Sequence, residues 1–504
     1  MIGTDLIASS LWPVLCLIIT ASVVLLLDVS PWRGFSKVLS LVGVIISLFL
    51  SFGLLGKDLS SFGGRFVVDN LSLSFYITIL VGTALALLIS FDFLAKHKLP
   101  EGEYYPLMLL ATSGAMVMAS ARDLIVLILG LEIMSLAVYV LATWRQEEET
   151  SEEAGMKYFL LGAFASAFFI YGIALVYGAT GSFSYQAILS AISAESFQSG
   201  LLASLGALFI LSAFGFKVAL VPFHQWAPDV YTGAPTSVTA FMSVVVKAGA
   251  FAAFLPFAML ALPQLSPALL QILSFLIAAT LIIANFSALM QRSVKRMLAY
   301  SAVAHAGYLA MALLAQPDIA SKAVSWYMLA YTLMTLGAFA ILALLGEGED
   351  NYESFAGLYH TRPFLAVAMT VFMLSLAGIP PFAGFYAKLL VFQAAVSGGY
   401  AWLAVLGIIT SIIALLYYVR VVISIFFNDS ARRLTPVTRP ASLIALGIAL
   451  LGTVLLGLAP QLWYQFLTGF YSQAFKFLIQ TPLVISRGVF CYIVLFKELM
   501  RYAK

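Results

Sequence analysis

Charged residues are scarce in this chain of 504 residues. They make up 10% of the sequence, and 62% of the residues are hydrophobic, whereas a typical soluble domain carries roughly 25% charged residues. A soluble fold would need polar residues to cover that much apolar surface, so lipid must be the solvent for most of the chain. The net charge of +3, with basic residues scattered along the chain, does not suggest a nucleic-acid partner.

Cysteine and histidine are also rare. The two cysteines, Cys16 and Cys491, lie inside apolar runs, which excludes a cysteine-ligated iron–sulfur cluster within the chain because such a cluster needs about four thiolates. Of the four histidines, His97 and His360 fall in loops, so a bis-histidine haem site is not expected. We therefore expect no metal and no cofactor in this chain.

No nucleotide-binding signature is present either. The chain has no P-loop, and because we predict no strands, no glycine-rich dinucleotide fingerprint follows one. The energy for any transport must therefore come from a partner or from an ion gradient.

Long apolar runs dominate the sequence. In a bilayer only helices or closed barrels satisfy the backbone, and runs of about twenty apolar residues select helices. We predict an all-α polytopic membrane protein of about fourteen spans, whose first span is retained because no basic region precedes it. The spans lie near 6–27, 35–55, 72–95, 104–120, 123–143, 157–179, 200–221, 236–258, 266–289, 298–315, 321–346, 363–396, 401–427 and 440–460.

Basic residues are distributed unevenly among the loops. The loops after odd-numbered spans carry twelve lysines and arginines, and the loops after even-numbered spans carry four. Cytoplasmic loops of membrane proteins hold the excess of basic residues. This bias predicts that the odd loops face the cytoplasm and that the N-terminus lies outside.

Proline interrupts two of the long spans. Pro222 follows Lys217 in KVALVPFHQWAP. In LAGIPPFAGFYAK, Pro380 and Pro381 precede Lys388. Proline frees backbone groups inside a helix, which a membrane tolerates only where protein or water satisfies them. The alternative is that each proline is an ordinary kink.

The two breaks predict an internal repeat. They lie 159 residues apart, and the starts of the fourth and ninth spans lie 162 residues apart. Two five-helix repeats, spans 4–8 and 9–13, explain these offsets. Five is odd, so the second copy must be inverted, as in transporters that bind near the membrane midplane. The predicted segments are 1–103 with three spans, 104–258 and 259–427 with one repeat each, and 428–504 with the last span and a tail.

Four charged residues fall in the middle of the predicted spans or next to their breaks: Glu132, Lys217, Lys247 and Lys388. Each charge in mid-span costs about 2.5–3.5 kcal/mol on insertion scales, so four sum to roughly 10 kcal/mol, comparable with the net stability of a domain. Burial disfavours the charged form of a lysine, and an approaching carboxylate favours it. A movement of Glu132 relative to Lys217 would therefore load or unload a proton. The alternative is a static salt bridge that joins two helices.

Polar residues at helical spacing share a face with Lys247, His305 and Glu132, and such faces can hold the water and hydroxyls of a proton relay. Thr236, Thr239 and Ser243 share a face with Lys247, and Ser301 and Tyr308 share one with His305. Ser135 and Tyr139 share a face with Glu132.

Some candidates keep two interpretations. Lys157 either joins the relay or extends its ammonium to the interface. His224 either ends the path at the cytoplasmic side or is a loop histidine, and His305 either takes part or is a satisfied core histidine. Arg420 is expected to be structural.

Three long segments resemble one family. FKVALVPFHQWAPDVYTGAPTSVTAF, VKRMLAYSAVAHAGYLAMAL and GIPPFAGFYAKLLVF resemble segments of the antiporter-like, proton-translocating membrane subunits of respiratory NADH–quinone oxidoreductase (complex I). The resemblance covers nearly the whole chain to about residue 470. It implies that the family's mid-membrane acid on helix five is Glu132, and that its lysines on helices seven, eight and twelve are Lys217, Lys247 and Lys388.

Within this family the chain resembles the N-type branch. It has no room for the long lateral helix of the L-type branch, and Lys388 stands where the M-type branch has a glutamate. The resemblance implies that quinone reduction elsewhere drives a proton outward, which costs roughly 3.5 kcal/mol per charge against a potential near 150 mV. It also implies that NADH, FMN, iron–sulfur clusters and quinone bind other subunits. The implied partners are other membrane subunits, including a second antiporter-like one, and the implied location is the bacterial plasma (inner) membrane.

The C-terminus departs from the family's pattern, and three alternative functions stay open. Residues 480–504 extend beyond the family's usual end and form an extra span, an interfacial segment or a tail. The chain could instead belong to a multisubunit sodium–proton antiporter. It could also belong to an energy-converting hydrogenase or a photosynthetic relative of complex I, or be a structural scaffold whose charges only bind neighbours.

Overall fold

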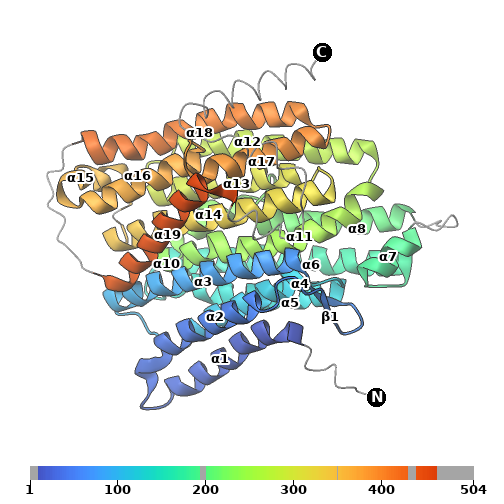
Figure 1. Cartoon of the computed structure of the whole chain (residues 1–504), viewed down its shortest axis with the longest axis horizontal. Helices are drawn as coiled ribbons and strands as arrows, with labels where there is room; N and C mark the ends of the chain where they lie inside the picture. The colour runs from blue at the N-terminus through green and yellow to red at the C-terminus, as the bar shows by residue number, and fades with distance from the viewer. Residues whose placement is uncertain (1–8, 193–199, 349, 429–438, 462–504) are drawn as a thin grey trace. The chain divides into compact units, whose positions relative to one another are not determined.

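The computed structural model describes residues 9–192, 200–348, 350–428 and 439–461 (Figure 1). The predicted extension at 480–504, with Cys491, lies outside these residues. The chain forms two compact units, Met1–Leu273 and Ser274–Lys504, whose boundary falls inside helix α12 (Pro267–Leu289). The four-segment division predicted from the repeat stays a prediction.

The first unit consists of helices joined by short connections. They are α1 (Trp12–Asp28), α2 (Ser36–Phe52), α3 (Asn70–His97), α4 (Tyr104–Ser120), α5 (Leu124–Ala142), α6 (Glu149–Thr180), α7 (Tyr185–Ile192), α8 (Gly200–Val218), α9 (Trp226–Gly233), α10 (Thr236–Phe241) and α11 (Lys247–Ala261). A π-helix, Met242–Val246, joins α10 to α11. Helices α1 and α2, at the blue end of the chain, pack side by side (Figure 1).

The second unit is built in the same way. Its helices after α12 are α13 (Val294–Ala312), α14 (Pro317–Leu345), α15 (Leu358–Thr361), α16 (Pro363–Ala377), α17 (Ala383–Ser397), α18 (Ala401–Phe427) and α19 (Pro440–Leu458). Helix α14 is the central element of this unit, because α13, α16, α17 and α19 all pack against it.

The helices suit a lipid solvent. In the described part of the chain, 11 helical segments are long and apolar enough to cross a membrane, and α16 and α17 are shorter apolar helices. Each predicted span overlaps a helix, with span 363–396 divided between α16 and α17. The helices differ widely in burial. In the most apolar stretch of α14, 94% of the residues are buried, whereas in that of α6 only 33% are buried. The exposed surface of α6 is apolar, so the prediction of an all-helical membrane protein is confirmed.

A short β-hairpin contradicts the expectation that the chain has no strands. Strand β1 (Leu59–Ser61) pairs antiparallel with β2 (Phe66–Val68). The turn between them contains Gly63 and Gly64, both with positive φ, a conformation that glycine adopts without steric cost. Three-residue strands are too short to produce an alternating apolar pattern, which is why the sequence did not reveal them.

Two aspartates fix the beginnings of α3 and α5. Asp69 forms a capping box with Ser72 at α3, and Asp123 accepts hydrogen bonds from two backbone N–H groups in the first turn of α5. Arg122 donates to Asp69 at 2.7 Å, and Arg65 of the hairpin lies 3.6 Å from Asp123. The hairpin and these ion pairs therefore hold the N-terminal end of α5 in place, and with it the helix that carries Glu132.

Both proline-containing spans are interrupted. Helix α8 ends at Val218 and α9 begins at Trp226, whereas α16 ends at Ala377 and α17 begins at Ala383. Side chains satisfy the carbonyls freed at these ends, as a membrane interior requires. The indole Nε1 of Trp226 donates to the carbonyl of Phe216 at 2.9 Å, and Nζ of Lys388 donates to that of Ala377 at 2.8 Å.

Candidate functional site

Lys217 lies in the last turn of α8, next to the break, with 5% of its surface exposed. The C-terminal end of a helix favours a cation. Its Nζ donates a hydrogen bond to Oγ of Ser135 on α5 at 2.7 Å. The rings of Tyr139 and Tyr158 lie 5.5 and 5.4 Å from the same Nζ, within cation–π distance. The lysine is thus held by a hydroxyl and two aromatic rings.

Glu132 lies about one turn before Ser135 on α5 and is half-buried. Its Oε1 accepts a hydrogen bond from Oγ of Ser166 on α6 at 2.6 Å. Among the ion pairs of the described residues, none joins Glu132 to Lys217. The static salt bridge considered from the sequence is therefore not formed in this structure, and each residue has its own hydroxyl partner.

Aromatic packing holds the break in the seventh span beside Lys217. The ring of Trp226, at the start of α9, stacks on Tyr158 of α6 with centroids 4.6 Å apart. Lys157, which precedes Tyr158 on α6, forms ion pairs with Glu153 at 2.6 Å and with Asp229 of α9 at 3.1 Å. Lys157 therefore links α6 to α9 through its ion pair with Asp229. The sequence alone did not show this contact.

Lys247 begins α11 and is 3% exposed. The π-helix Met242–Val246 directly precedes it. A π-helix shifts the helical phase, so the face that we predicted for Lys247 from ideal α-helical spacing is interrupted there. The Thr239 hydroxyl donates at 2.8 Å to the Tyr231 carbonyl, and Ser243 donates to its own helix at 2.9 Å. Such π-segments are frequent at functional sites, and no glycine or proline in the sequence signals this one.

Lys388 is the corresponding lysine of the second unit and is 1% exposed. Its Nζ donates to the carbonyl of Ala377, at the broken end of α16, at 2.8 Å and to Oγ of Ser411 on α18 at 2.6 Å. The ring of Tyr308 on α13 lies 5.0 Å from this Nζ. As with Lys217, a helix end, a hydroxyl and an aromatic ring surround the ammonium.

His305 forms a hydrogen-bonded chain with tyrosines of neighbouring helices. Its Nδ1 lies 2.6 Å from the hydroxyl of Tyr327 on α14, and its Nε2 lies 3.2 Å from that of Tyr418 on α18. The Tyr418 hydroxyl also bonds to Ser301, which shares the face of His305 as predicted. Tyr308, the other predicted neighbour, bonds instead to Thr410 of α18 at 3.2 Å. The sequence could not reveal Tyr327 or Tyr418, because they come from other helices.

The remaining candidates have distinct surroundings. His224 lies between α8 and α9, and its buried Nδ1 has no hydrogen-bond partner among the described residues. The guanidinium of Arg420 lies 4.1 Å from the centroid of the Tyr352 ring and donates to the carbonyl of Gln291 at 3.3 Å, which fits a structural residue. No group of three or more possible metal ligands occurs within the described ranges.

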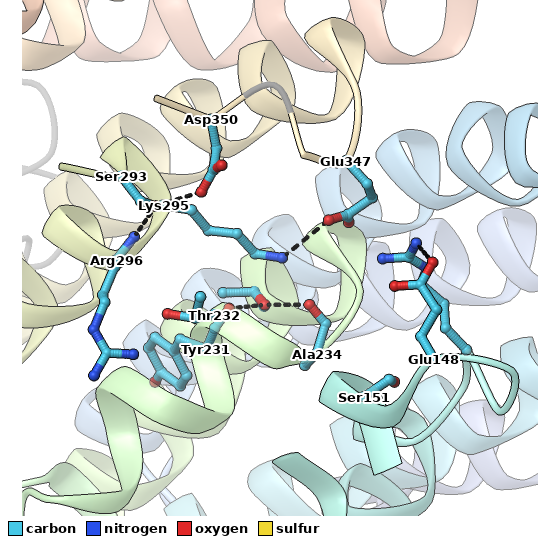
Figure 2. A network of polar contacts seen from close by, with 12 residues as sticks. Glu148, Ser151, Tyr231, Thr232, Ala234, Ser293, Lys295, Arg296, Glu347 and Asp350 are labelled. Atoms are coloured by element: carbon cyan, nitrogen blue, oxygen red, sulfur yellow. Dashed lines mark hydrogen bonds and ion pairs between the residues drawn. The ribbon is translucent and has the colours of Figure 1, made fainter. Parts of the chain in front are cut away.

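A buried ion pair in the second unit was missed from the sequence. Lys295 is one of the basic residues that the sequence placed in the loops after odd-numbered spans. It is only 3% exposed, and its Nζ lies 3.3 Å from Oε2 of Glu347 (Figure 2). Beside it, Ser293 caps α13 by accepting from the Arg296 N–H at 3.1 Å and donates to Asp350. The close-up shows Lys295 and Glu347 pointing toward each other (Figure 2). The sequence places the two residues 52 positions apart, so only the fold brings them together.

Comparison with known proteins identifies this architecture. Residues 121–414 match the family model described as "NADH:quinone oxidoreductase/Mrp antiporter, TM". NADH-quinone oxidoreductase subunit N of Trichlorobacter lovleyi is 42% identical over 86% of this chain and 90% of its own length. The subunit N of Deinococcus radiodurans is 46% identical over 80% of this chain and 83% of its own length.

Solved structures agree with these matches. A chain of respiratory complex I from Thermus thermophilus superposes with a TM-score of 0.77 at 36% identity, over 89% of this chain and 98% of its own. A chain of an archaeal membrane-bound sulfane sulfur reductase superposes with a TM-score of 0.82 at 25% identity, over 91% of this chain and 96% of its own. A chain of the Mrp complex from Dietzia shares the fold, with a TM-score of 0.77 at 22% identity, over 91% of this chain and 96% of its own.

The family match and the superposition over most of the chain place this all-helical fold among the antiporter-like, proton-translocating membrane subunits of respiratory complexes. Within that class, the chain belongs to the subunit N family of NADH-quinone oxidoreductase, complex I. It is thus a multi-pass membrane subunit of that enzyme, as the sequence predicted.

Proposed function

We propose that protons cross this subunit through the two lysine clusters, with Lys217 and Glu132 in the first unit and Lys388 and His305 in the second. Lys247 supplies a further proton-carrying group. The observation that carries this proposal is the surroundings of Lys217, a buried lysine whose Nζ contacts the hydroxyl of Ser135 rather than a carboxylate.

Hydroxyl partners suit a lysine that changes its protonation state. A serine hydroxyl accepts a hydrogen bond from an ammonium and can donate one to a neutral amine. A permanent ion pair would hold the charged form instead, because an opposite charge at close range favours it. Ser135 and Ser411 donate their protons to the carbonyls of Leu131 and Ala377 while the ammonium is charged. When Lys217 or Lys388 loses a proton, a turn of the serine hydroxyl toward the amine supplies the new hydrogen bond.

In the second unit, His305 extends the proposed path beyond Lys388. Its two ring nitrogens contact hydroxyls of Tyr327 and Tyr418 on different helices. A neutral imidazole accepts at one nitrogen and donates at the other, so a proton taken up on one side can leave on the other. His224, with its buried Nδ1, lies between α8 and α9, and we place it at the cytoplasmic end of the path.

Quinone reduction in other subunits supplies the energy, and the cofactors reside there. The assembled subunit spans the bacterial inner membrane about fourteen times. To the 11 long apolar helices this count adds α4, α13 and the α16–α17 pair, which overlap predicted spans. Its N-terminus lies outside, and its repeats, α4 to α11 and α12 to α18, are inverted relative to each other. Its partners are the other membrane subunits of complex I, including a second antiporter-like subunit.

The substitution Lys217→Ala in the whole complex tests this proposal. Assembly, NADH-driven quinone reduction and proton uptake are measured together in native membranes. Lys57→Ala removes an exposed lysine and is the matched control. The proposal predicts normal assembly of Lys217→Ala with quinone reduction and pumping reduced about 10²-fold or more, the size of a lost acid–base group.

Two other results would contradict the proposal. Wild-type pumping by assembled Lys217→Ala would make this residue a structural charge. Failed assembly of Lys217→Ala, with normal pumping per assembled complex, would support the scaffold alternative instead. Lys57→Ala must stay at wild-type levels in each measurement.

A further inference from the structure

A small cavity lies between α5, α6 and α8. Its volume, counted as the space that the centre of a water molecule can occupy, is about 10 Å³. Its polar lining residues are Tyr139, Ser166 and Lys217. A cavity of roughly 10–15 Å³ on this measure holds one water molecule, provided that two to four polar partners surround it. The space therefore fits one water molecule.

The polar residues around this cavity have hydrogen-bonding capacity left for a water. The ammonium of Lys217 has three N–H donors, of which Ser135 accepts one. Ser166 donates its only proton to Glu132 at 2.6 Å, so its oxygen lone pairs can accept from a water. The Tyr139 hydroxyl can donate or accept. These groups meet the requirement for an ordered internal water.

Gly162 keeps the cavity open. A Cβ atom built on it would lie 2.0 Å from the Tyr139 hydroxyl oxygen and 2.6 Å from the ring carbon that carries it. Any larger residue at position 162 would push the Tyr139 ring aside and occupy the space.

We propose that this cavity binds one water molecule, which connects Lys217 to Ser166 and through it to Glu132. The inference rests on the proposed function and adds a residue that relays the proton, Ser166, which neither the sequence nor the family match assigned. A proton passes from the Lys217 ammonium to the water, from the water to Ser166, and from Ser166 to the Glu132 carboxylate. Each oxygen on the way gains one proton and gives up one, so only the lysine and the glutamate change charge.

Ser166→Ala tests the hydroxyl in this connection. The variant keeps the size of the side chain but loses the contact to Glu132 and one partner of the water. Pumping and quinone reduction should fall about tenfold, the rate equivalent of one lost hydrogen bond, and Ser166→Thr should restore both. Ser212→Ala is the matched control, because Ser212 on α8 donates only to its own helix at Leu208.

Gly162→Ala tests the cavity itself. It should reduce pumping as Ser166→Ala does, by displacing the water. Gly178→Ala lies on the same helix, α6, where the added methyl would meet only Leu202 at 3.7 Å, an ordinary contact. This control should pump like the wild type, which separates loss of the water from a general effect of alanine on α6.

A density map of the whole complex, at a resolution that shows ordered water, completes the test. The inference predicts a water between Lys217 and Ser166 in the wild type and its absence in Gly162→Ala. An empty cavity in the wild type, or normal pumping by assembled Ser166→Ala, overturns the inference. If Lys217→Ala still abolishes pumping, the proposed function survives that failure. If Lys217→Ala pumps normally, the proposed function itself fails.

Discussion

Lys388 and Ser411 lie on adjacent spans of the second unit and are joined by a 2.6 Å hydrogen bond. In the first unit, Lys217 and Ser135 make the same kind of contact at 2.7 Å. Each unit thus buries a lysine beside a broken helix and satisfies it with a neutral hydroxyl. Burying an unpaired charge costs much free energy. The hydroxyl and the aromatic ring near each ammonium lower this cost, and neither carries the negative charge that would hold the lysine in its charged form.

The Ser411 hydroxyl is expected to position Lys388 for proton transfer. Ser411→Ala removes one of two hydrogen bonds from Nζ and leaves the contact with the Ala377 carbonyl. Proton pumping should fall about tenfold, and Ser411→Thr should recover it. Ser397→Ala on α17, the helix of Lys388, is the control because Ser397 bonds only to its own helix. Equal pumping by both alanine variants would refute the assignment.

His305 is expected to carry protons rather than simply fill the core. His305→Ala should lower pumping about 10²-fold, in the range of a removed acid–base group. Tyr418→Phe, which removes the Nε2 contact of His305 and the bond to Ser301 but keeps the Nδ1 contact, should have a smaller effect. His360 is exposed, so His360→Ala serves as the histidine control. A core histidine would instead show reduced thermal stability of the complex with pumping unchanged.

The sequence determined the spans, because hydropathy and length directly reflect what a bilayer requires. It also located both helix breaks, the half-buried Glu132 and the buried Lys217, Lys247 and Lys388, because proline and charge inside apolar runs are visible without a fold. It placed Ser135 beside Glu132, since both lie on one helix at i and i+3.

The sequence did not reveal contacts between helices. Tyr327 and Tyr418 reach His305 from other spans, and Ser166 reaches Glu132 from 34 residues away. No residue type in Met242–Val246 signals the π-helix before Lys247. We counted Lys295 as a basic residue of a loop, because its partner, Glu347, is adjacent only in the fold.

Close packing of α4 against α5 should make Gly114 intolerant of substitution. A Cβ there would lie 2.6 Å from the Met134 backbone nitrogen and 2.7 Å from the Gly130 carbonyl oxygen, neither of which can move without shifting a helix. Gly114→Ala should destabilise the subunit by about 1–3 kcal/mol. The temperature at which the complex loses quinone reductase activity should fall accordingly.

Gly447→Ala controls for the change in helix propensity, because a Cβ at Gly447 on α19 meets nothing within 4 Å. Alanine favours a helix over glycine by about 1 kcal/mol at either position. If Gly114→Ala were as stable as Gly447→Ala, the contact between α4 and α5 would be looser than the structure has it.

The buried pair of Lys295 and Glu347 is expected to be structurally sensitive. Glu347→Gln removes the charge opposite a buried ammonium, and breaking such a pair costs about 3–5 kcal/mol. Less assembled complex, or a lower inactivation temperature, should result. Glu353→Gln alters an exposed carboxylate in the same segment and should leave both unchanged. Stability of Glu347→Gln equal to that of Glu353→Gln would mean that the pair contributes nothing.

The most direct test that one proton path uses both lysine clusters is to measure whether substitutions in the two clusters affect pumping independently. Pumping per NADH oxidised is measured for complexes carrying Lys217→Ala, Lys388→Ala and both changes together. Groups that act as a unit give strongly non-additive losses, so the double variant should pump no worse than either single variant. Losses that multiply in the double variant, or normal pumping by either single one, would contradict the account.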